Sequence, residues 1–199
     1  MYIFLSLQVL NREPPVDILG KPPFETTYSN YDKVKILIEQ GGIYLDMDVM
    51  VVRPFDEVRR YGCTLGLENE LRTCAGIIVC AKDHPFLYTW LDSYYDDYEL
   101  YKNIWAFHSG NIPTVLIRRY PNLIHIEPMK FHRPGPHPDF LGSIWGNRTF
   151  NWGENYSVHT YIRLLNKMPL ITEESIKTMN STYGHLARQV FYGSTELLG

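Results

Sequence analysis

The feature that most restricts the fold of this chain is a helix-like segment, followed by two glycines and an alternating segment. Ser29 suits a helix N-cap, and apolar residues recur at helical spacing until Gly41-Gly42, which predicts a helix of about eleven residues. From Ile43 to Val49 apolar residues alternate with polar ones, and the apolar run continues to Val52. This pattern predicts a strand with one buried face. A helix, a tight turn and a strand form the αβ half of a parallel α/β sheet.

The rest of the chain predicts further α/β structure in one domain. Besides the elements above, we expect strands near residues 16–19, 75–81 and 123–127, and helices over 85–98, from Pro113, and from Thr172 onward. The stretch 131–152 is rich in Pro and Gly, which predicts an irregular loop that faces a ligand. No repeat or linker interrupts the pattern, so residues 1–199 are interpreted as a single domain.

Composition and charge exclude several classes of protein. With 45% hydrophobic and 21% charged residues the chain has ordinary globular composition. The net charge of −3 and the lack of a long basic run argue against a nucleic-acid partner. No apolar run reaches the roughly 20 residues of a membrane span, and the first ten residues do not resemble a signal peptide.

Cysteines and glycosylation sequons bear on the compartment. The three cysteines are Cys63, Cys74 and Cys80. They permit at most one disulfide and leave a free thiol, and their spacing does not indicate which two would pair. Three Asn-x-Ser/Thr sequons, a mild excess over chance, favour a lumenal history: Asn147, Asn155 and Asn180. Because the export signal is missing from the chain, we expect that an N-terminal part has been truncated.

Two aspartates stand where strands rarely carry them. Asp46 and Asp48 are two residues apart, which would place both carboxylates on one strand face, about 6–7 Å apart. Such carboxylates repel each other unless a cation lies near them, and Mg²⁺ or Mn²⁺ suits carboxylate oxygens. For a bare Asp-x-Asp, which is a common tripeptide, an edge strand with a solvated acidic face is the more frequent explanation, and this alternative stays open.

The sequence around the two aspartates resembles the sugar-binding, DXD-containing region of family 32 glycosyltransferases. The family pattern there is a Ser-Asp-x-x-Arg helix start followed by Gly-Gly-Ile-Tyr-Leu-Asp-x-Asp. This chain has Ser29-Asn30-Tyr31-Asp32-Lys33 and then Gly41-Gly42-Ile43-Tyr44-Leu45-Asp46-Met47-Asp48, without a gap. The resemblance covers roughly residues 14–192, and further matching blocks are Arg53-Pro54, 81–86, 110–114 and 156–159. Relatives include α-1,4-galactosyl- and N-acetylglucosaminyltransferases and α-1,6-mannosyltransferases.

The resemblance implies a fold, a reaction and a location. It implies a GT-A-like nucleotide-diphospho-sugar transferase fold, with a mixed, mostly parallel sheet flanked by helices. It implies a nucleotide-sugar donor, Mn²⁺ or Mg²⁺ as cofactor, and retention of anomeric configuration. A full-length form would be a type II protein anchored in the Golgi membrane and facing the Golgi lumen. Only 45 residues precede Asp46, so the usual nucleotide cradle looks incomplete.

The resemblance also implies roles for individual residues. Asp48 would ligate the metal, and Asp46 would contact the metal or hydroxyls of the donor's ribose and sugar, so both count as catalytic. Tyr44 would line the donor pocket, with a packed strand tyrosine as the alternative. His159 would be a third metal ligand, since imidazole suits Mn²⁺, with an ordinary packed histidine as the alternative.

Two positions depart from the family pattern. Asn30 and Lys33 replace the Asp and Arg that bind the donor sugar, so a carboxylate charge and a planar guanidinium are lost. The leading hypothesis is a retaining transferase that moves a hexose or N-acetylhexosamine from a UDP-sugar to a glycan or glycolipid hydroxyl. A non-catalytic sugar- or nucleotide-binding remnant is the alternative. A metal-dependent phosphohydrolase has less support, because no second acidic cluster is present.

Overall fold

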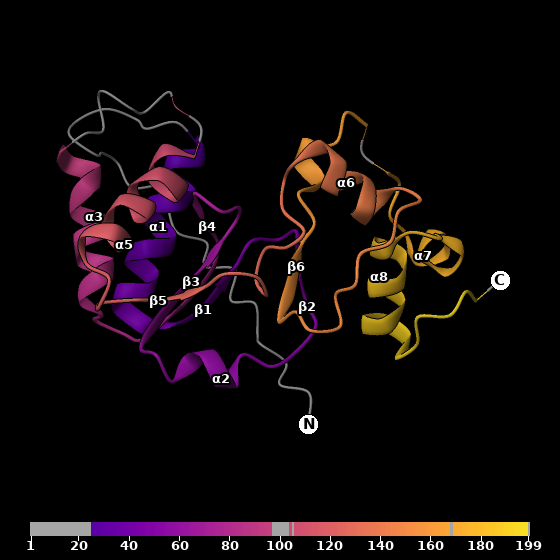
Figure 1. The fold of residues 1–199 in the computed structure, drawn as a ribbon, viewed down its shortest axis with the longest axis horizontal. Coiled ribbons are helices and arrows are strands. Elements are labelled where there is room, and N and C mark those ends of the chain that lie inside the picture. Colours follow the sequence, from indigo (N-terminus) through magenta and orange to yellow (C-terminus); the bar gives the residue numbers. More distant parts are fainter. Residues whose placement is uncertain (1–24, 97–103, 105, 168, 199) are drawn as a thin grey trace.

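The computed structural model describes residues 25–96, 104, 106–167 and 169–198, and the expected strand near residues 16–19 lies outside them. The chain forms two halves that lie side by side (Figure 1). The elements of the first half are α1 (Glu25–Gln40), β1 (Gly42–Leu45), α2 (Asp56–Arg59), β3 (Cys63–Leu67), β4 (Thr73–Cys80), α3 (Pro85–Asp96), the π-helix η1 (Phe107–Asn111), α5 (Ile112–Arg119) and β5 (His125–Glu127). Those of the second are β2 (Val49–Val51), α6 (Pro138–Trp145), β6 (Ser157–His159), the 3₁₀ helix η2 (Ile162–Leu164), α7 (Glu173–Thr178) and α8 (Thr182–Tyr192).

The first half is built on a four-stranded sheet in the order β1-β4-β3-β5. The α/β class and the mixed sheet flanked by helices are confirmed. The expectation of a mostly parallel sheet is wrong for the described strands, since β4 is antiparallel to both β1 and β3 and only β3 and β5 run parallel. The reason lies between β3 and β4, where a tight turn is closed by the Glu68 amide donating to the Arg72 carbonyl, at 2.9 Å. A tight hairpin of this kind joins only antiparallel strands.

Apolar residues cover both faces of this sheet. On one face the helices α1, α3 and α5 pack against it, and fully buried members of this cluster include Val34, Ile78 and Trp90. On the other face Ile77 packs with Val58 of α2 and with Phe131. Since Ile77 and Ile78 are neighbours that point to opposite faces, β4 is buried on both sides, as a central strand should be.

The end of α1 agrees with the sequence and its start does not. Gly41 has a φ of +64° and a Cβ there would overlap the backbone of Lys82, so a glycine is required where the helix turns into β1. The helix begins at Glu25, four residues before the predicted N-cap Ser29, and is 16 residues long. The prediction of an eleven-residue helix is therefore wrong at its first turn.

The second half begins where a single strand was predicted over residues 43–52. Instead β1 ends at Leu45, a turn follows in which the Val49 amide donates to the Asp46 carbonyl at 3.1 Å, and β2 enters a second sheet. There β2 pairs antiparallel with β6, and Val49 lies opposite His159. Asp46 and Asp48 therefore lie in the connection between two sheets, and the prediction that they share one strand face is wrong.

The C-terminal segments are helical. Within the stretch expected to be an irregular loop, α6 begins after His137, whose Nδ1 accepts from the Asp139 amide, with Pro138 in its first turn. The helices α7 and α8 confirm the predicted helical tail. Thr172 forms a capping box with Ser175 at the start of α7.

The strands and helices predicted in the middle of the chain are confirmed as β4, α3, α5 and β5.

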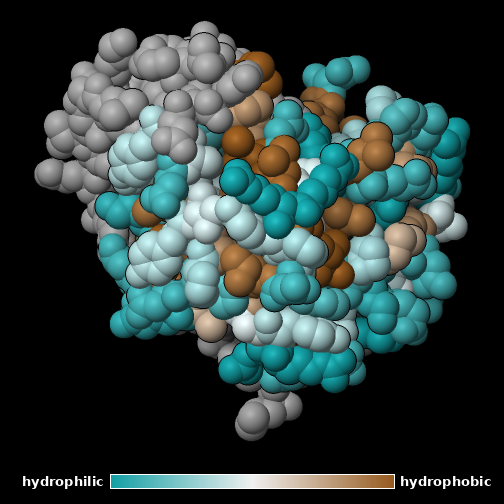
Figure 2. All heavy atoms as spheres, turned by 60° about the vertical axis from the view of Figure 1, so that its left-hand side comes forward, coloured by the Kyte–Doolittle hydropathy of each residue, from teal (hydrophilic) through white to brown (hydrophobic). Residues whose placement is uncertain are grey.

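Figure 2 shows a mostly hydrophilic face of the molecule, on which hydrophobic side chains emerge in separate places. In the described part of the chain, no helix combines the length and the hydropathy that a membrane crossing needs.

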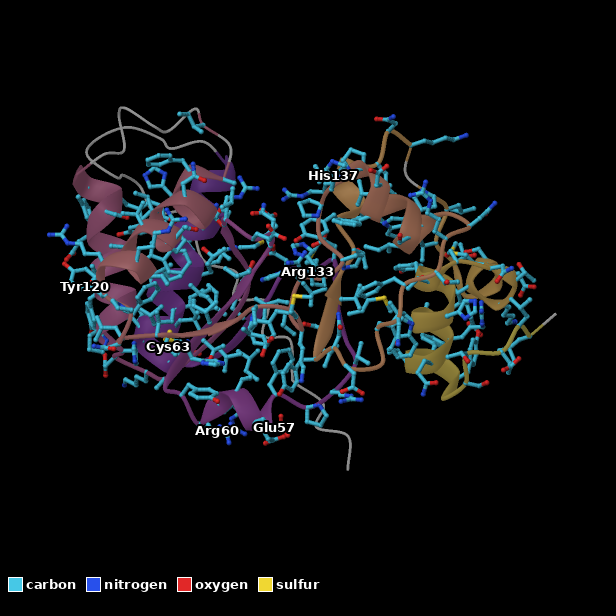
Figure 3. The ribbon with its side chains drawn as sticks, viewed as in Figure 1. Glu57, Arg60, Cys63, Tyr120, Arg133 and His137 are labelled. Atoms are coloured by element: carbon cyan, nitrogen blue, oxygen red, sulfur yellow. A yellow bond between two sulfur atoms is a disulfide. The ribbon has the colours of Figure 1, made fainter. Side chains whose placement is uncertain are left out.

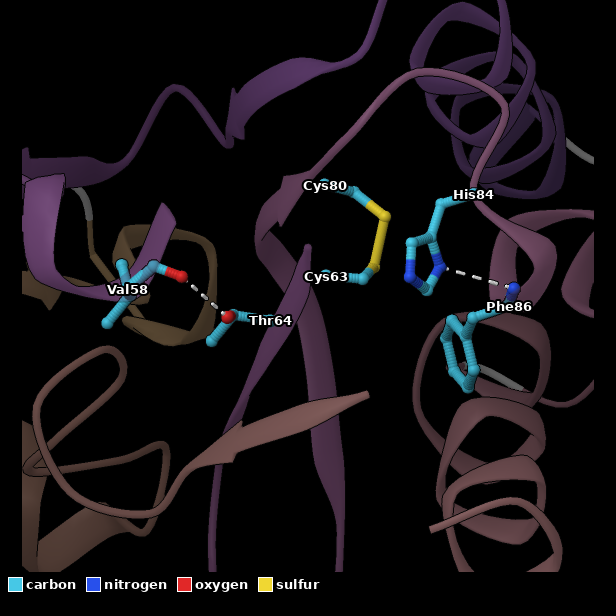
Figure 4. Close-up of a disulfide and its surroundings, with 6 residues drawn as sticks. All are labelled: Val58, Cys63, Thr64, Cys80, His84 and Phe86. Atoms are coloured by element: carbon cyan, nitrogen blue, oxygen red, sulfur yellow. Dashed lines mark hydrogen bonds between the residues drawn. A yellow bond between two sulfur atoms is a disulfide. The ribbon is translucent and has the colours of Figure 1, made fainter. Parts of the chain in front are cut away.

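A disulfide joins the central strands. Cys63 of β3 and Cys80 of β4 are bonded, and they lie opposite each other in the register of the two strands (Figure 4). His84 lies beside the bridge, and its Nδ1 accepts a hydrogen bond from the Phe86 amide at 3.3 Å. Cys74 is the free thiol that the odd number of cysteines required.

Candidate metal and donor site

The site lies where the chain passes from the first sheet to the second. The Asp46 amide donates to the carbonyl of Gly76 on β4 at 2.8 Å, which holds Asp46 against the first sheet. The Asp48 carbonyl accepts from the Thr160 amide and hydroxyl, both at 2.9 Å, which holds Asp48 against the second. Each aspartate is therefore fixed by its own backbone to a different half of the molecule.

His159 reaches this site from the distant end of the chain. Because Val49 pairs with His159 in the β2–β6 ladder, the imidazole lies next to Asp48, and its Nε2 donates to Asp48 Oδ1 at 3.1 Å. A carboxylate oxygen of Asp46, one of Asp48 and a ring nitrogen of His159 all lie within 4.8 Å of one another. The structure thus brings together the three residues that the sequence proposed as metal ligands.

Their burial and charge suit a cation. The Asp46, Asp48 and His159 side chains are 25%, 17% and 6% exposed. Burial lowers the pKa of His159, but the hydrogen bond and the charge of Asp48, together with Cys74, raise it more, to about 10. Burial raises the pKa of Asp48, but the hydrogen bond and charge of His159, a backbone hydrogen bond and the charge of Arg163 together lower it more, so the pKa is lowered. The protein therefore holds an imidazolium beside two carboxylates, and a cation bound there would take the place of a proton.

Two neighbours fix the carboxylate of Asp46. The Tyr44 hydroxyl donates to Asp46 Oδ1 at 2.7 Å, and Lys33 Nζ lies 3.4 Å from the same oxygen. Lys33 is only 4% exposed, donates also to the Ala75 carbonyl, and lies 4.4 Å from the centre of the Tyr44 ring. Burial lowers the pKa of Lys33, and Asp46 opposes this shift.

Donor binding by Tyr44, Lys33 and Asn30 stays a prediction. The contacts seen for Tyr44 and Lys33 orient Asp46 rather than face open solvent. Asn30 is half-buried on α1, and among the described residues no hydrogen bond joins its side chain to either aspartate of the site.

Gly76 leaves the room that the site needs. A Cβ on Gly76 would lie 2.7 Å from His159 Cε1 and 3.0 Å from Asp46 Oδ2, both closer than ordinary van der Waals contact. The two ligands from different halves can therefore approach each other over β4 only because this position has no side chain.

Sequence reasoning missed two side chains behind His159. His132 is completely buried, and its Nδ1 lies 3.3 Å from His159 Nδ1. Cys74 Sγ lies 4.0 Å from the same nitrogen. Neither residue stands in a sequence spacing typical of metal ligands, so only the folded chain reveals them. The Tyr161 ring stacks on the His159 ring, with centres 3.9 Å apart, and covers the face of the imidazole.

The donor set fits a hard divalent ion. Two carboxylates and one imidazole match Mn²⁺ or Mg²⁺, which favour oxygen ligands and leave positions open for phosphate oxygens. Of the other groups with comparable ligand spacing among the described residues, one contains the disulfide and the other contains Cys74, His132 and His159.

An open cavity of about 650 Å³ lies between the β3–β4 turn and the segment that leads into α6. Its lining mixes charged, amide and aromatic side chains, including Glu68, Asn69, Arg133, His137 and Phe140. Figure 3 shows Arg133 and His137 on this segment. Such a lining suits a polyhydroxylated ligand, since aromatic rings stack on apolar faces while polar groups take hydroxyls.

Comparison with known proteins agrees with this geometry. The model of the glycosyltransferase sugar-binding region containing the DXD motif matches residues 8–65, which include both aspartates. Over these residues the resemblance to the DXD-containing glycosyltransferase region is confirmed. The chain is also similar to glucan organizing enzyme 1 of Cryptococcus neoformans var. grubii, with 27% identity over 92% of this chain. The chain spans about half, 53%, of the length of that relative. No solved structure matches significantly.

Proposed function

We propose that this chain carries the donor and metal site of a retaining glycosyltransferase. The enzyme would move a hexose or N-acetylhexosamine from a UDP-sugar to a hydroxyl of a glycan or glycolipid. The observation that carries the proposal is the convergence of Asp46, Asp48 and His159 at one point of the fold. The match of residues 8–65 to a glycosyltransferase sugar-binding region supports it.

The residues of the site have separate tasks in this reaction. Asp48 and His159 would hold a divalent ion with Asp46, and the ion, when bound, would supply positive charge for the leaving nucleoside diphosphate. Lys33 balances the charge of Asp46, and the Tyr44 hydroxyl fixes which way its carboxylate faces. Asp46 is therefore held ready to accept hydrogen bonds from donor hydroxyls or to contact the ion, without rearranging.

The acceptor would lie in the cavity next to the segment before α6. Its lining offers Arg133 and Glu68 for sugar hydroxyls, and the edge-to-face pair of His137 and Phe140, with ring centres 5.8 Å apart, for a sugar face. The relative's name refers to glucan. A glucan oligosaccharide is therefore the first acceptor to test.

We propose that the protein acts in the Golgi lumen, at its membrane. The Cys63–Cys80 disulfide supports a compartment of the secretory route, because disulfides persist where the environment is oxidising. The sequons at Asn147 and Asn180 lie on exposed positions and agree with such a location.

Calorimetric titration with a panel of nucleotide-sugars, with and without Mn²⁺, tests the proposal. We expect Mn²⁺-dependent binding that is lost in Asp48→Asn and kept in Asp56→Asn, a matched control whose carboxylate is exposed and pairs only with Arg59 among the described residues. Incubation with acceptor oligosaccharides should then give a product whose anomeric configuration equals that of the donor. A nucleotide-sugar affinity that is unchanged both without Mn²⁺ and in Asp48→Asn would contradict the proposal.

Two other results would select the competing hypotheses. Metal-dependent binding without transfer to any acceptor favours the non-catalytic remnant, for which Asn30 and Lys33 are the motivating residues. Release of phosphate from the nucleotide without an acceptor favours a phosphohydrolase.

A further inference from the structure

A second group of metal-ligating side chains lies directly behind the proposed donor site. It consists of Cys74 on β4, His132 after β5, and His159 on β6, whose ligand atoms all lie within 4.8 Å of one another. Two of these residues, His132 and His159, are buried, and Cys74 is half-buried. The group joins three segments that are far apart in the sequence.

The hydrogen bonds of His132 leave part of its buried ring without a partner. Its ring is fully buried, its Nε2 has no hydrogen-bond partner among the described residues, and its Nδ1 lies against another imidazole at 3.3 Å. A buried polar atom without a partner destabilises a fold, and an apolar side chain here would avoid that loss. The fold therefore keeps an imidazole here although Nε2 gains no partner, and the nitrogen that it presents to His159 is Nδ1.

The hydrogen bonding of His159 directs one nitrogen into this group. Since Nε2 donates to Asp48, the second nitrogen, Nδ1, faces Cys74 and His132. A metal-bound histidine commonly donates its other N–H to a carboxylate, and the Asp48–His159 pair has this arrangement. The 3.3 Å between the two Nδ1 atoms equals about one edge of a tetrahedron around Zn²⁺, whose bonds to nitrogen are about 2.0–2.1 Å.

We propose that Cys74, His132 and His159 form a second metal site, which takes a thiophilic ion such as Zn²⁺. The ion binds the Cys74 thiolate and the two Nδ1 atoms, and the protons of the thiol and of His159 Nδ1 leave to solvent. The thiolate and the adjacent Asp48 carboxylate together balance the two positive charges, so the buried site carries no net charge.

The two sites share His159 and therefore influence each other. An ion on Nδ1 keeps the proton on Nε2, and Nε2 is the nitrogen that faces Asp48 and the proposed Mn²⁺ position. Zn²⁺ in the inner site would thus remove one ligand from the outer site. Binding of Zn²⁺ and of Mn²⁺ should oppose each other, and by linkage the effect is reciprocal.

Cobalt absorption spectroscopy tests the inner site on the intact chain in non-reducing buffer. Co²⁺ should give a thiolate-to-metal charge-transfer band with one ion per chain, and Zn²⁺ should abolish it by displacement. The band should be lost in Cys74→Ser and in His132→Gln. It should persist in Asp46→Asn and in His84→Gln, the control for the histidine beside the disulfide.

A second measurement does not depend on any variant folding. In the unmodified protein, Zn²⁺ should slow alkylation of Cys74, which is the free thiol, and Mg²⁺ should not. Absence of the cobalt band in folded protein, its persistence in Cys74→Ser, or unchanged alkylation with Zn²⁺ would each overturn the proposal. Because the inner site binds without a nucleotide-sugar, these results stand apart from a failure of the proposed transferase function.

Discussion

Replacing Gly76 by alanine tests whether the close approach of Asp46 and His159 over β4 makes the site. The new Cβ would lie 2.7 Å from His159 Cε1, so the imidazole must move by roughly 0.7 Å to reach the ordinary contact distance of 3.4 Å. His159 cannot move freely, because its backbone pairs with Val49 and its ring stacks on Tyr161. Because the backbone of His159 is held, we expect its ring to rotate about the side-chain bonds and away from Asp48. The distances between the ligand atoms of Asp46, Asp48 and His159 would then increase.

The effect on stability should be smaller than the effect on metal binding. Overpacking destabilises a fold by about 1–3 kcal/mol, while replacing a strand glycine by alanine recovers about 0.5–1 kcal/mol of backbone entropy. The free energy of unfolding should thus fall by only about 0–2.5 kcal/mol. A shift of 0.7 Å is, by contrast, large compared with the tolerance of about 0.2 Å in metal–ligand distances.

The assay combines urea unfolding with titration of Mn²⁺ followed by electron paramagnetic resonance. We expect Gly76→Ala to fold and to lose most of its Mn²⁺ affinity. Gly142→Ala is the control: it adds the same methyl group within α6, where the Cβ would meet nothing within 4 Å, and should leave Mn²⁺ binding unchanged. Native Mn²⁺ affinity in folded Gly76→Ala would refute the reasoning.

Three further predictions concern charge, covalent structure and glycosylation. Lys33→Met should lower the free energy of unfolding by about 1–3 kcal/mol in metal-free buffer, because Asp46 loses its buried cationic partner. In Mn²⁺ the loss should be smaller, since the bound ion replaces that charge. Equal losses in thermal melts with and without Mn²⁺ would contradict this. Reducing the Cys63–Cys80 bridge, which closes 17 residues of chain, should lower the free energy of unfolding by about 3 kcal/mol in urea titrations, and Cys74→Ser should show the same loss on reduction. Asn155 is only 6% exposed and its side-chain amide donates to the carbonyls of Arg133 and Ser157, so it is not available for a glycan. Mass spectrometry of protein from a secretory host should therefore find glycans at Asn147 or Asn180 and none at Asn155.

Local sequence determined some parts of this fold and could not determine others. Gly41 ends α1 through its own backbone preference, and the facing residues of α3 follow helical periodicity, so both were predictable. The break at Met47 was not, because alternation of apolar and polar residues looks the same in one strand as in two strands joined by a short turn. The start of α1 before Ser29 was missed since a good N-cap residue can also lie inside a helix.

The candidate site shows the same division. The motif alone indicated Asp46 and Asp48, and family resemblance added His159. The pairing of Val49 with His159, 110 residues later, is a tertiary event that no local pattern encodes. For the same reason His132 and Cys74 carried no signal in the sequence. The Pro-rich stretch hid α6, although Pro138 in its first turn and apolar residues at 141 and 144 were compatible with a helix.

The position of the ligands between two sheets ties ion occupancy to the relative orientation of the halves. Asp46 is anchored to the first sheet through Gly76, while Asp48 and His159 are anchored to the second. An ion held by all three residues would cross-link the two halves. Any hinge motion at residues 46–48 would change the distances between the ligand atoms of that ion. The halves should fluctuate more freely without the ion than with it, as hydrogen exchange at the amides of Asp46 and Thr160 would report.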